Sequence, residues 1–374
     1  MPYFFEVRNV NMSKSFEAPR FDSISHFLQS GGFDYRIYDM GRKVTLLSRN
    51  EFKQIESQQQ LYPYPFQRKA SLALLLWQQD NSSINYINEP VIWFLQFPID
   101  ELGYLQQESR DGFLLGLLEQ VGKNIESTLK GLIKSDDMSE SPFAFKPVEE
   151  RLAMLHALAT LDLGQQPSHY YQATREYLKG SLGYEQWQFL GLQGIADVVA
   201  RLGGTDNEEL LDSALPQLPE VPLESICLML ENTQPKVLLA KTLIDLLKEQ
   251  AASDDPNIRL ATALLRALSG VGADIERRTF LLDLLTQRVP NKLVQNIECL
   301  VAISGRCWLD LKSEKLLEAF IENLIIQDQI AFNAVLSDLM MLPNMKEKIL
   351  VILKGENKTK GLSKRVESFL HDFY

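Results

Sequence analysis

Hydrophobic and polar positions follow two different patterns along the chain, and the change falls near residue 147. Before it, residues 69–79 and 90–97 are nearly continuous apolar runs with aromatic residues, which indicates strands covered on both faces. After it, apolar residues recur at helical spacing in one short segment after another, with no competing strand pattern. The sequence therefore predicts an α+β amino-terminal domain followed by an all-α region.

Residues 21–135 are expected to form the small α+β domain, with an antiparallel sheet of about four strands. Two alternating runs over residues 35–46 surround a four-residue turn, residues 39–42, and indicate a hairpin in which Gly41 is available for a positive φ. A helix is expected over residues 109–132, where apolar residues recur at helical spacing.

Residues 147–374 are expected to form a HEAT-like α-helical repeat domain, an α-solenoid. Alternate helix starts are separated by roughly 31–39 residues over the later part, close to the period of known helix-pair repeats. Each short amphipathic helix cannot bury its apolar face alone, so neighbouring helices must stack on it. Candidate helices begin near residues 147, 168, 184, 206, 222, 235, 256, 274, 291, 313, 328, 344 and 362.

Two of these helix starts carry the pattern of a capping box. In this pattern a polar side chain at the helix start and a Glu three residues later each bond a free backbone N–H. The pairs are Thr205 with Glu208 and Asn344 with Glu347. They predict helices that begin directly after residues 205 and 344.

Two further segments flank or join the predicted domains. Residues 1–20 are interpreted as an amino-terminal extension, and residues 136–146 as a polar linker between the α+β domain and the helical repeats. If the domains are flexibly joined, proteolysis should cut the chain first near residues 135–141.

The charge balance argues against one class of function. The 374 residues include 38 Lys and Arg against 49 Asp and Glu, a formal net charge of −11, whereas a generic nucleic-acid-binding protein is basic. The acidic excess lies in residues 148–343, with 16 basic and 27 acidic side chains, and residues 344–374 are modestly basic. Nucleic acid is therefore not an expected partner, and a nucleic-acid-binding helical-repeat protein ranks as the last alternative.

The ends of the chain and its cysteines indicate a cytoplasmic location. The first fifteen residues do not form a secretory signal, and no apolar run approaches the roughly 18 residues that span a bilayer. The three cysteines, Cys227, Cys299 and Cys307, are widely spaced and form no CxxC pair. They are expected to be reduced core residues.

No catalytic motif is found in the sequence. There is no HExxH, GxSxG or Walker loop, and the four histidines show no metal-ligand spacing. Gly191 and Gly194 are interpreted as sites of close helix packing, because no strand precedes them as a phosphate-binding loop requires. We therefore predict no catalytic residue, no cofactor and no metal ligand.

An enzyme with a site at the interface of the two domains remains an alternative, since such sites assemble from residues far apart in sequence. A deep pocket that holds two titratable groups with perturbed pKa values would support it.

Two segments are candidates for contact with a protein partner. In the hairpin, charged side chains cluster with tyrosines, and they either brace the turn or present a recognition surface. The Pro-aromatic segment of residues 62–66 is a stiff, extended strip that either docks on its own domain or binds a partner. The predicted partner-binding residues are Tyr38, Asp39, Arg42, Tyr62, Tyr64 and Phe66.

Three features in this order, YDMGR at residues 38–42, YPYP at residues 62–65 and an apolar run that ends in Trp77, carry a family resemblance. From about Phe21 onward the chain resembles an uncharacterised family of gamma-proteobacterial proteins, known only as a domain of unknown function. The resemblance implies a bacterial cytoplasmic protein and brings no activity, cofactor or site. The first hypothesis is thus a non-enzymatic protein-interaction scaffold or adaptor, with a protein partner of unknown identity.

Overall fold

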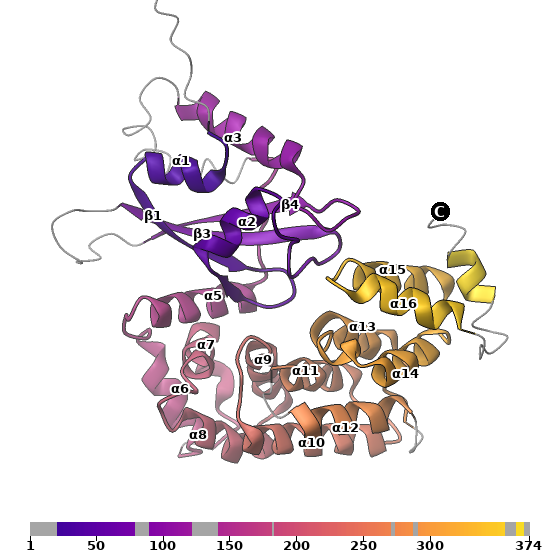
Figure 1. Ribbon diagram of the computed structural model, residues 1–374. Helices are drawn as coiled ribbons and strands as arrows, with labels where there is room; N and C mark the ends of the chain where they lie inside the picture. The colour runs from indigo at the N-terminus through magenta and orange to yellow at the C-terminus, as the bar shows by residue number, and fades with distance from the viewer. Residues whose placement is uncertain are drawn as a thin grey trace, which may run out of the picture.

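The computed structural model describes residues 21–78, 90–121, 141–181, 183–270, 274–286, 291–355 and 364–369. It has a small antiparallel sheet near the amino terminus, and the rest is mostly helical (Figure 1). We call residues 21–121 the head and the helices from residue 147 onward the array.

The described residues of the head form four strands and three helices. In chain order they are α1 (Ile24–Ser30), β1 (Phe33–Asp39), β2 (Thr45–Leu47), α2 (Arg49–Glu56), β3 (Lys69–Gln78), β4 (Val91–Pro98) and α3 (Gln107–Val121). The strand order is β2-β1-β3-β4 and every pair is antiparallel, with Tyr38 opposite Ala73 and Leu74 opposite Trp93. The predicted hairpin and the four-stranded antiparallel sheet are therefore confirmed.

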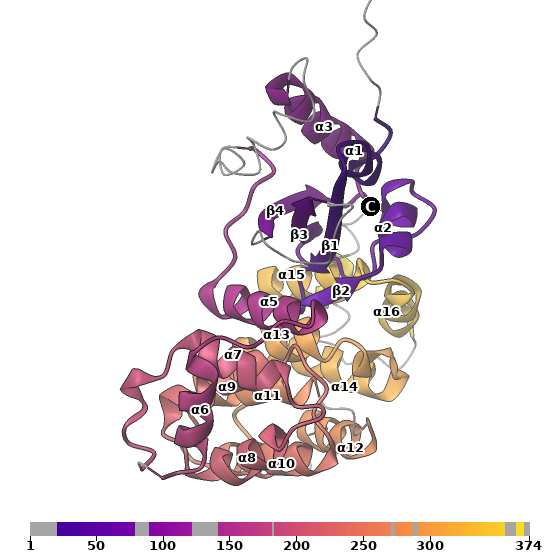
Figure 2. The same ribbon diagram turned by 90° about the vertical axis from the view of Figure 1, so that its left-hand side faces the viewer.

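Both faces of the sheet are covered (Figures 1 and 2). One face packs against α1, α2 and α3, and Leu74 belongs to this head core. On the opposite face Tyr38, Ala73 and Leu75 belong to a core that continues into the array. Leu74 and Leu75 are both at most 1% exposed, which explains why residues 72–77 of β3 are apolar at successive rather than alternate positions.

The array contains helices that follow one another with short turns between them. They are α5 (Glu149–Asp162), α6 (Tyr170–Leu178), α7 (Leu192–Ala200), α8 (Asn207–Ala214), α9 (Glu220–Leu230), α10 (Val237–Ala252), α11 (Ile258–Leu268), α12 (Asp274–Leu285), α13 (Ile297–Arg306), α14 (Glu314–Leu324), α15 (Gln329–Met340) and α16 (Met345–Lys354). In the described part of the array, short 3₁₀ turns lie between some of these helices: η2 (Trp187–Phe189), η3 (Leu215–Gln217) and η4 (Asp310–Lys312). Residues 364–369 form a further helical turn.

The helices of the array form two rows. In the inner row, α5, α7, α9, α11, α13 and α15 each contact the next, and in the outer row α6, α8, α10, α12, α14 and α16 do the same. The head lies on the side of the inner row (Figure 1). Each apolar helix face is thus buried by a neighbour, as the amphipathic pattern requires.

Both predicted capping boxes are wrong. Helix α8 begins at Asn207, one residue later than expected, and the Thr205 hydroxyl accepts a hydrogen bond from the Asn207 N–H at 3.3 Å instead of closing a box with Glu208. Asn344 precedes α16 but has a φ of 65°, and its side chain makes no capping bond. A tertiary contact occupies the Glu208 side chain, which accepts a hydrogen bond from the backbone N–H of Lys236.

The end of the predicted linker is packed against the head. The Phe143 carbonyl accepts a hydrogen bond from the Gln96 N–H at 2.7 Å, and the Phe145 N–H donates to the Phe94 carbonyl at 3.2 Å. Phe143 packs against the head core beside Phe97. The first part of the predicted linker, residues 136–140, and residues 122–132 of the predicted long helix lie outside the described residues, as does the extension of residues 1–20.

Candidate functional site at the junction of head and array

The junction is built around the loop between β1 and β2, residues 40–44, which we call the hairpin loop. Its Arg42 side chain is fully buried. The guanidinium donates from Nε to the Pro65 carbonyl at 2.8 Å, from Nη1 to the Ser304 carbonyl at 3.3 Å and from Nη2 to Asp338 Oδ2 at 2.6 Å. A guanidinium carries five N–H donors in one plane, so a single side chain can meet these three separate acceptors. Arg42 therefore joins the head to two helices of the array.

The hairpin loop contacts the carboxyl ends of four inner helices. Lys43 Nζ donates to the carbonyl of Ser269, the C-cap of α11, at 2.9 Å, and the Val44 N–H donates to Asn232 Oδ1 just after α9 at 2.8 Å. The Ser304 and Asp338 acceptors lie in the last turns of α13 and α15. Helix carboxyl ends carry free carbonyls and a partial negative charge, so cations are favoured there.

Asp39 is enclosed within the junction. It is 0% exposed, and its carboxylate accepts hydrogen bonds from the Tyr62 hydroxyl and, at 3.1 Å, from the Gly41 N–H. Burial raises the pKa of Asp39 to about 7, although the Tyr62 hydrogen bond and the positive charge of Arg151 oppose the rise. Asp39 is thus an acid poised near neutrality.

The turn needs glycine for a reason other than the expected one. Gly41 does not have a positive φ. Instead, a Cβ at this position would lie 3.3 Å from Asp39 Oδ1 and 3.4 Å from both the Phe66 Cβ and the Tyr64 carbonyl. The close approach of Asp39 and of the Pro-aromatic segment, not the turn conformation, leaves little room for a side chain here.

Buried charges of the array complete the junction. Glu231, directly after α9, is fully buried, and its carboxylate accepts hydrogen bonds from Arg266 at 2.6 and 3.0 Å and from Arg306 at 2.8 Å. Burial alone would raise the pKa of Glu231, but the two arginines outweigh it and hold the pKa at about 2. Arg151, in the first turn of α5, lies 3.9 Å from Glu231 and donates to the Met40 carbonyl of the hairpin loop.

The six residues predicted to contact a partner all lie at this junction. Tyr38, Asp39, Arg42 and Tyr62 are at most 2% exposed, whereas Tyr64 and Phe66 are half-buried. Tyr64 packs edge-on against Trp308 of the array, and the Phe66 ring faces the guanidinium groups of Arg42 and Arg306. Tyr38, Arg42, Tyr64 and Phe66 thus contact the array of the same chain, whereas Asp39 and Tyr62 bond one another within the head.

Several junction residues were missed from the sequence. Arg151, Glu231, Arg266, Arg306, Trp308 and Asp338 lie in no recognisable motif. A signal does exist, because Arg266 and Arg306 lie 35 and 75 residues after Glu231, near the ends of successive inner helices. Aligning the helix pairs with one another would have placed these charges at one end of the inner row.

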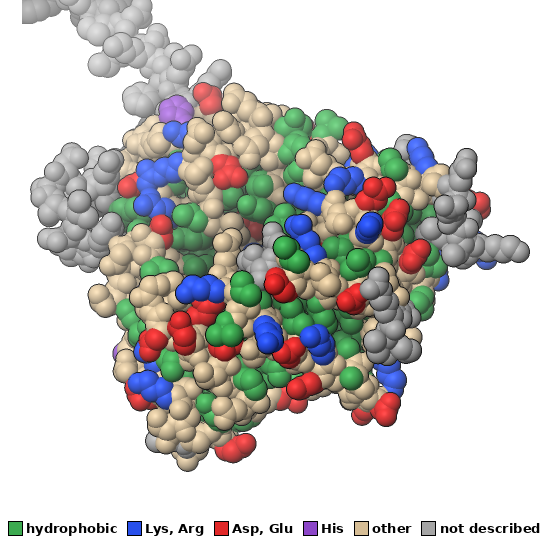
Figure 3. Space-filling model, turned by 60° about the horizontal axis from the view of Figure 1, so that its bottom comes forward, with side chains coloured by type: hydrophobic (Ala, Val, Ile, Leu, Met, Phe, Trp, Pro, Cys, Tyr) green, Lys and Arg blue, Asp and Glu red, His purple; other side chains and the backbone are tan. Residues whose placement is uncertain are grey.

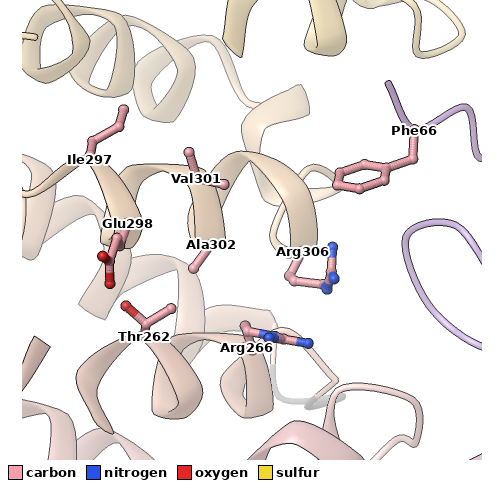
Figure 4. Close-up of a pocket in the computed structure, with 8 residues that line it drawn as sticks. All are labelled: Phe66, Thr262, Arg266, Ile297, Glu298, Val301, Ala302 and Arg306. Atoms are coloured by element: carbon pink, nitrogen blue, oxygen red, sulfur yellow. The ribbon is translucent and has the colours of Figure 1, made fainter. Parts of the chain in front are cut away.

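An apolar groove opens on one side of the hairpin loop (Figure 4). Its volume is about 310 Å³, and its walls are formed by α11, α13 and the Phe66 ring. Val301 of α13 is 44% exposed in this groove. The groove is lined by Phe66, Thr262, Arg266, Ile297, Glu298, Val301, Ala302 and Arg306.

A larger cleft opens between the head and the array. Its volume is about 860 Å³, within the range of small-molecule sites. Tyr38 and Lys43 of the head and Leu158, Leu161 and Trp308 of the array line it. Burial lowers the pKa of Lys43 to about 8.

The remaining sequence-based expectations concern metals, membranes and thiols. Within the described ranges, no group of three His, Cys, Asp or Glu side chains could hold a metal ion, and no helix is long and apolar enough to cross a membrane.

Cys227, Cys299 and Cys307 are free and buried, as predicted. Burial raises the pKa of Cys299 to about 11 and that of Cys307 to about 12.

Comparison with known proteins gives one match. A family model described as "Protein of unknown function (DUF3549)" matches residues 20–370. The match covers most of the chain and begins where the resemblance in the sequence begins, near Phe21. No curated protein and no solved structure matches the chain.

Proposed function

We propose that this chain, which belongs to the DUF3549 family of unknown function, is a non-enzymatic protein-interaction scaffold of the bacterial cytoplasm. The array acts as a HEAT-like α-solenoid, and its inner face binds a protein partner. The two rows of helices, in which each member contacts the next of its row, support this proposal. Stacked helix pairs present long continuous faces of this kind for binding.

The observation that carries the proposal is the apolar groove between α11 and α13 (Figure 4). The arginines at its edge, Arg266 and Arg306, are already paired with Glu231 and do not require an acidic partner. The floor is apolar, with Ile297, Val301 and Ala302. The groove therefore fits a partner segment that inserts an apolar side chain against Val301.

The position of the Pro-aromatic segment changes how this contact should be tested. Tyr62 is 0% exposed and supports Asp39, so its replacement would damage the fold as well as any binding surface. Of the six predicted residues, Phe66 is the one that lines the groove. The test therefore uses exposed positions of the array.

The experiment is affinity purification of the tagged chain from its native cells, with two valine variants compared. Val301→Asp places a charge in the groove, and Val351→Asp makes the same change at a valine of the outer-row helix α16 that is 66% exposed. A partner retained by wild type and Val351→Asp but lost with Val301→Asp supports the proposal. A partner retained by all three, with each variant shown to be folded, excludes the groove as the contact.

The alternative of nucleic-acid binding lacks a matching surface on the face shown in Figure 3. There Lys and Arg side chains are intermixed with Asp and Glu, and no continuous basic area forms. A salt-dependent gel shift below about micromolar protein would reverse this ranking.

The alternative of an enzyme at the domain interface has one observation in its favour. The cleft holds Lys43 and Glu231, two groups with perturbed pKa values. However, Glu231 is fully buried and bound by two arginines, so it is not available for proton transfer. The cleft therefore supports binding better than it supports catalysis.

A further inference from the structure

The wall of the cleft between head and array includes a tyrosine whose buried hydroxyl has no hydrogen-bond partner among the described residues. Tyr38 is 2% exposed, and no described residue bonds its hydroxyl. The side chain leaves β1 on the sheet face that packs on the array, and it lines the cleft. Burial and the nearby charge of Asp162 raise its pKa, so the hydroxyl keeps its proton and can donate it. A buried hydroxyl without a partner costs stability unless something bonds it.

The same cleft contains a cation without a carboxylate partner. Four charged side chains line it, and among described residues three of them are paired: Asp162 with Arg36 at 2.9 Å, Glu231 with Arg266 at 2.6 Å, and Arg277 with Asp310 at 2.8 Å. The fourth, Lys43, contacts only the Ser269 carbonyl and the face of the Trp308 ring, 5.4 Å from its centroid. Among the described residues, Lys43 is thus the cation of this lining that has no carboxylate partner, in a region where Glu231 and Asp310 each bind two arginines.

We propose that this cleft binds a small monocarboxylic acid with an apolar body. The carboxylate lies against Lys43 Nζ, the Tyr38 hydroxyl donates a hydrogen bond to a polar atom of the ligand, and the body packs on Leu158, Leu161 and Trp308. This function is separate from the protein contact in the groove on the other side of the hairpin loop.

The charge and the lining select this class of ligand. Lys43 offers one direct ion pair to a carboxylate, and the arginines that share Glu231 and Asp310 leave the region with an excess of positive charge, so an anionic ligand is favoured. Two leucines and a tryptophan offer apolar walls, and a volume of about 860 Å³ admits a molecule of moderate size. A purely polar acid would leave these walls without contact.

The test measures binding of octanoate to the full chain by titration calorimetry, with octanamide as the matched uncharged probe. Octanoate should bind saturably, and octanamide at least about tenfold more weakly, because only the acid pairs with Lys43. Equal affinity for the two probes would overturn the proposal. The absence of saturable binding up to about 10 mM octanoate would also overturn the proposal, because a dissociation constant above that concentration is too weak for a functional site.

Two variants locate the site. Tyr38→Phe removes only the unbonded hydroxyl, so it should leave the chain at least as stable while weakening octanoate binding about threefold or more. Lys43→Met should weaken binding about tenfold, whereas Lys241→Met, at an exposed lysine of α10, should not change it. Thermal unfolding checks that each variant is folded. Unchanged octanoate affinity in folded Tyr38→Phe and Lys43→Met would place the binding elsewhere and refute the proposal.

Discussion

Asp39 is a buried acid whose pKa is shifted by its surroundings. Its pKa of about 7 lies well above the value of about 3.9 that an Asp has in an unfolded chain. The folded state therefore holds a proton that the unfolded state has already lost over the pH range between these values. This makes the stability of the molecule depend on pH in a definite direction.

We expect the free energy of unfolding to fall as pH rises from about 4 to 7, by at most about 1.4 kcal/mol per pH unit from this residue. Above about pH 7 both states are ionised and this contribution is constant. Asp39→Asn keeps an oxygen that can accept from Tyr62 but cannot ionise, so its stability should lack this slope. Urea unfolding of both proteins between about pH 5 and 8 measures the difference. Parallel curves for the two proteins would show that Asp39 titrates normally.

Arg42 is the residue whose loss should weaken the junction most. Arg42→Met removes the cation paired with Asp338 and the donor to two helix-end carbonyls, and we expect a loss of about 3 kcal/mol of unfolding free energy. The matched control is Arg36→Met, on the same hairpin, whose pair with Asp162 is about one-third exposed. That change should cost less than about 1 kcal/mol. Equal losses in urea unfolding would contradict the assignment of Arg42 as the central link.

The sequence identified these residues as a cluster but not what they bind. The concentration of charged and aromatic residues around Tyr38 to Arg42 and the stiff strip from Tyr62 to Phe66 were visible in the chain. Two roles were considered for these residues, bracing the turn or recognising a surface. Each role describes part of the outcome, because the surface that they recognise belongs to the same chain. The acceptors, Ser304 and Asp338, carry no local signal, since a backbone carbonyl and one Asp on an amphipathic helix are ordinary features.

At the scale of elements, Gly194 controls how closely α6 and α7 approach. A Cβ at this position would lie 2.3 Å from the Thr174 hydroxyl and 3.0 Å from the Tyr170 carbonyl, whereas a Cβ at Gly191 would meet Tyr170 at an ordinary 3.9 Å. We expect Gly194→Ala to cost about 1–3 kcal/mol by forcing the helices apart, and Gly191→Ala to be within about 0.5 kcal/mol of wild type. Thermal unfolding of the two variants tests this, and similar stabilities would mean that the packing adjusts.

The elements themselves were largely predictable, and their ends were not. The apolar run through Leu72 to Trp77 predicted β3 and its double burial, because hydrophobic periodicity reports how many faces of an element are covered. The capping box predicted for α8 was wrong because Glu208 bonds Lys236 rather than the helix end. Distant contacts of this kind determine helix ends, and a local capping pattern does not contain them.

At the scale of the whole molecule, the sheet belongs to two hydrophobic cores at once. Leu74 faces the head core and Leu75 faces the array core, and both are fully buried. We expect Leu74→Ala and Leu75→Ala each to cost about 2–5 kcal/mol and to lower the temperature of one shared unfolding transition in calorimetry. If Leu75→Ala left the transition unchanged, the array would not cover this face in solution.

The docking of head on array could not be predicted from the sequence. Hydrophobic patterning showed that a second face of the sheet had to be covered, but not by which element. The answer depends on contacts such as Lys43 with Ser269 and Val44 with Asn232, which join residues 226 and 188 positions apart. No periodicity extends over such a separation, and only the three-dimensional arrangement of the helix ends reveals it.

The late position of α15 in the chain also affects how the protein folds during its synthesis. Asp338 follows Arg42 by 296 residues, so a ribosome that adds about 5–20 residues per second exposes the hairpin loop roughly 15–60 s before its final acceptor emerges. During synthesis the head has enough chain to complete its own core, while Tyr38, Ala73 and Leu75 have no array to cover them. The nascent protein therefore carries an apolar sheet face until the array helices emerge and an unpaired guanidinium for most of its translation, and we expect a chaperone that shields this face to raise its folding yield in the cell.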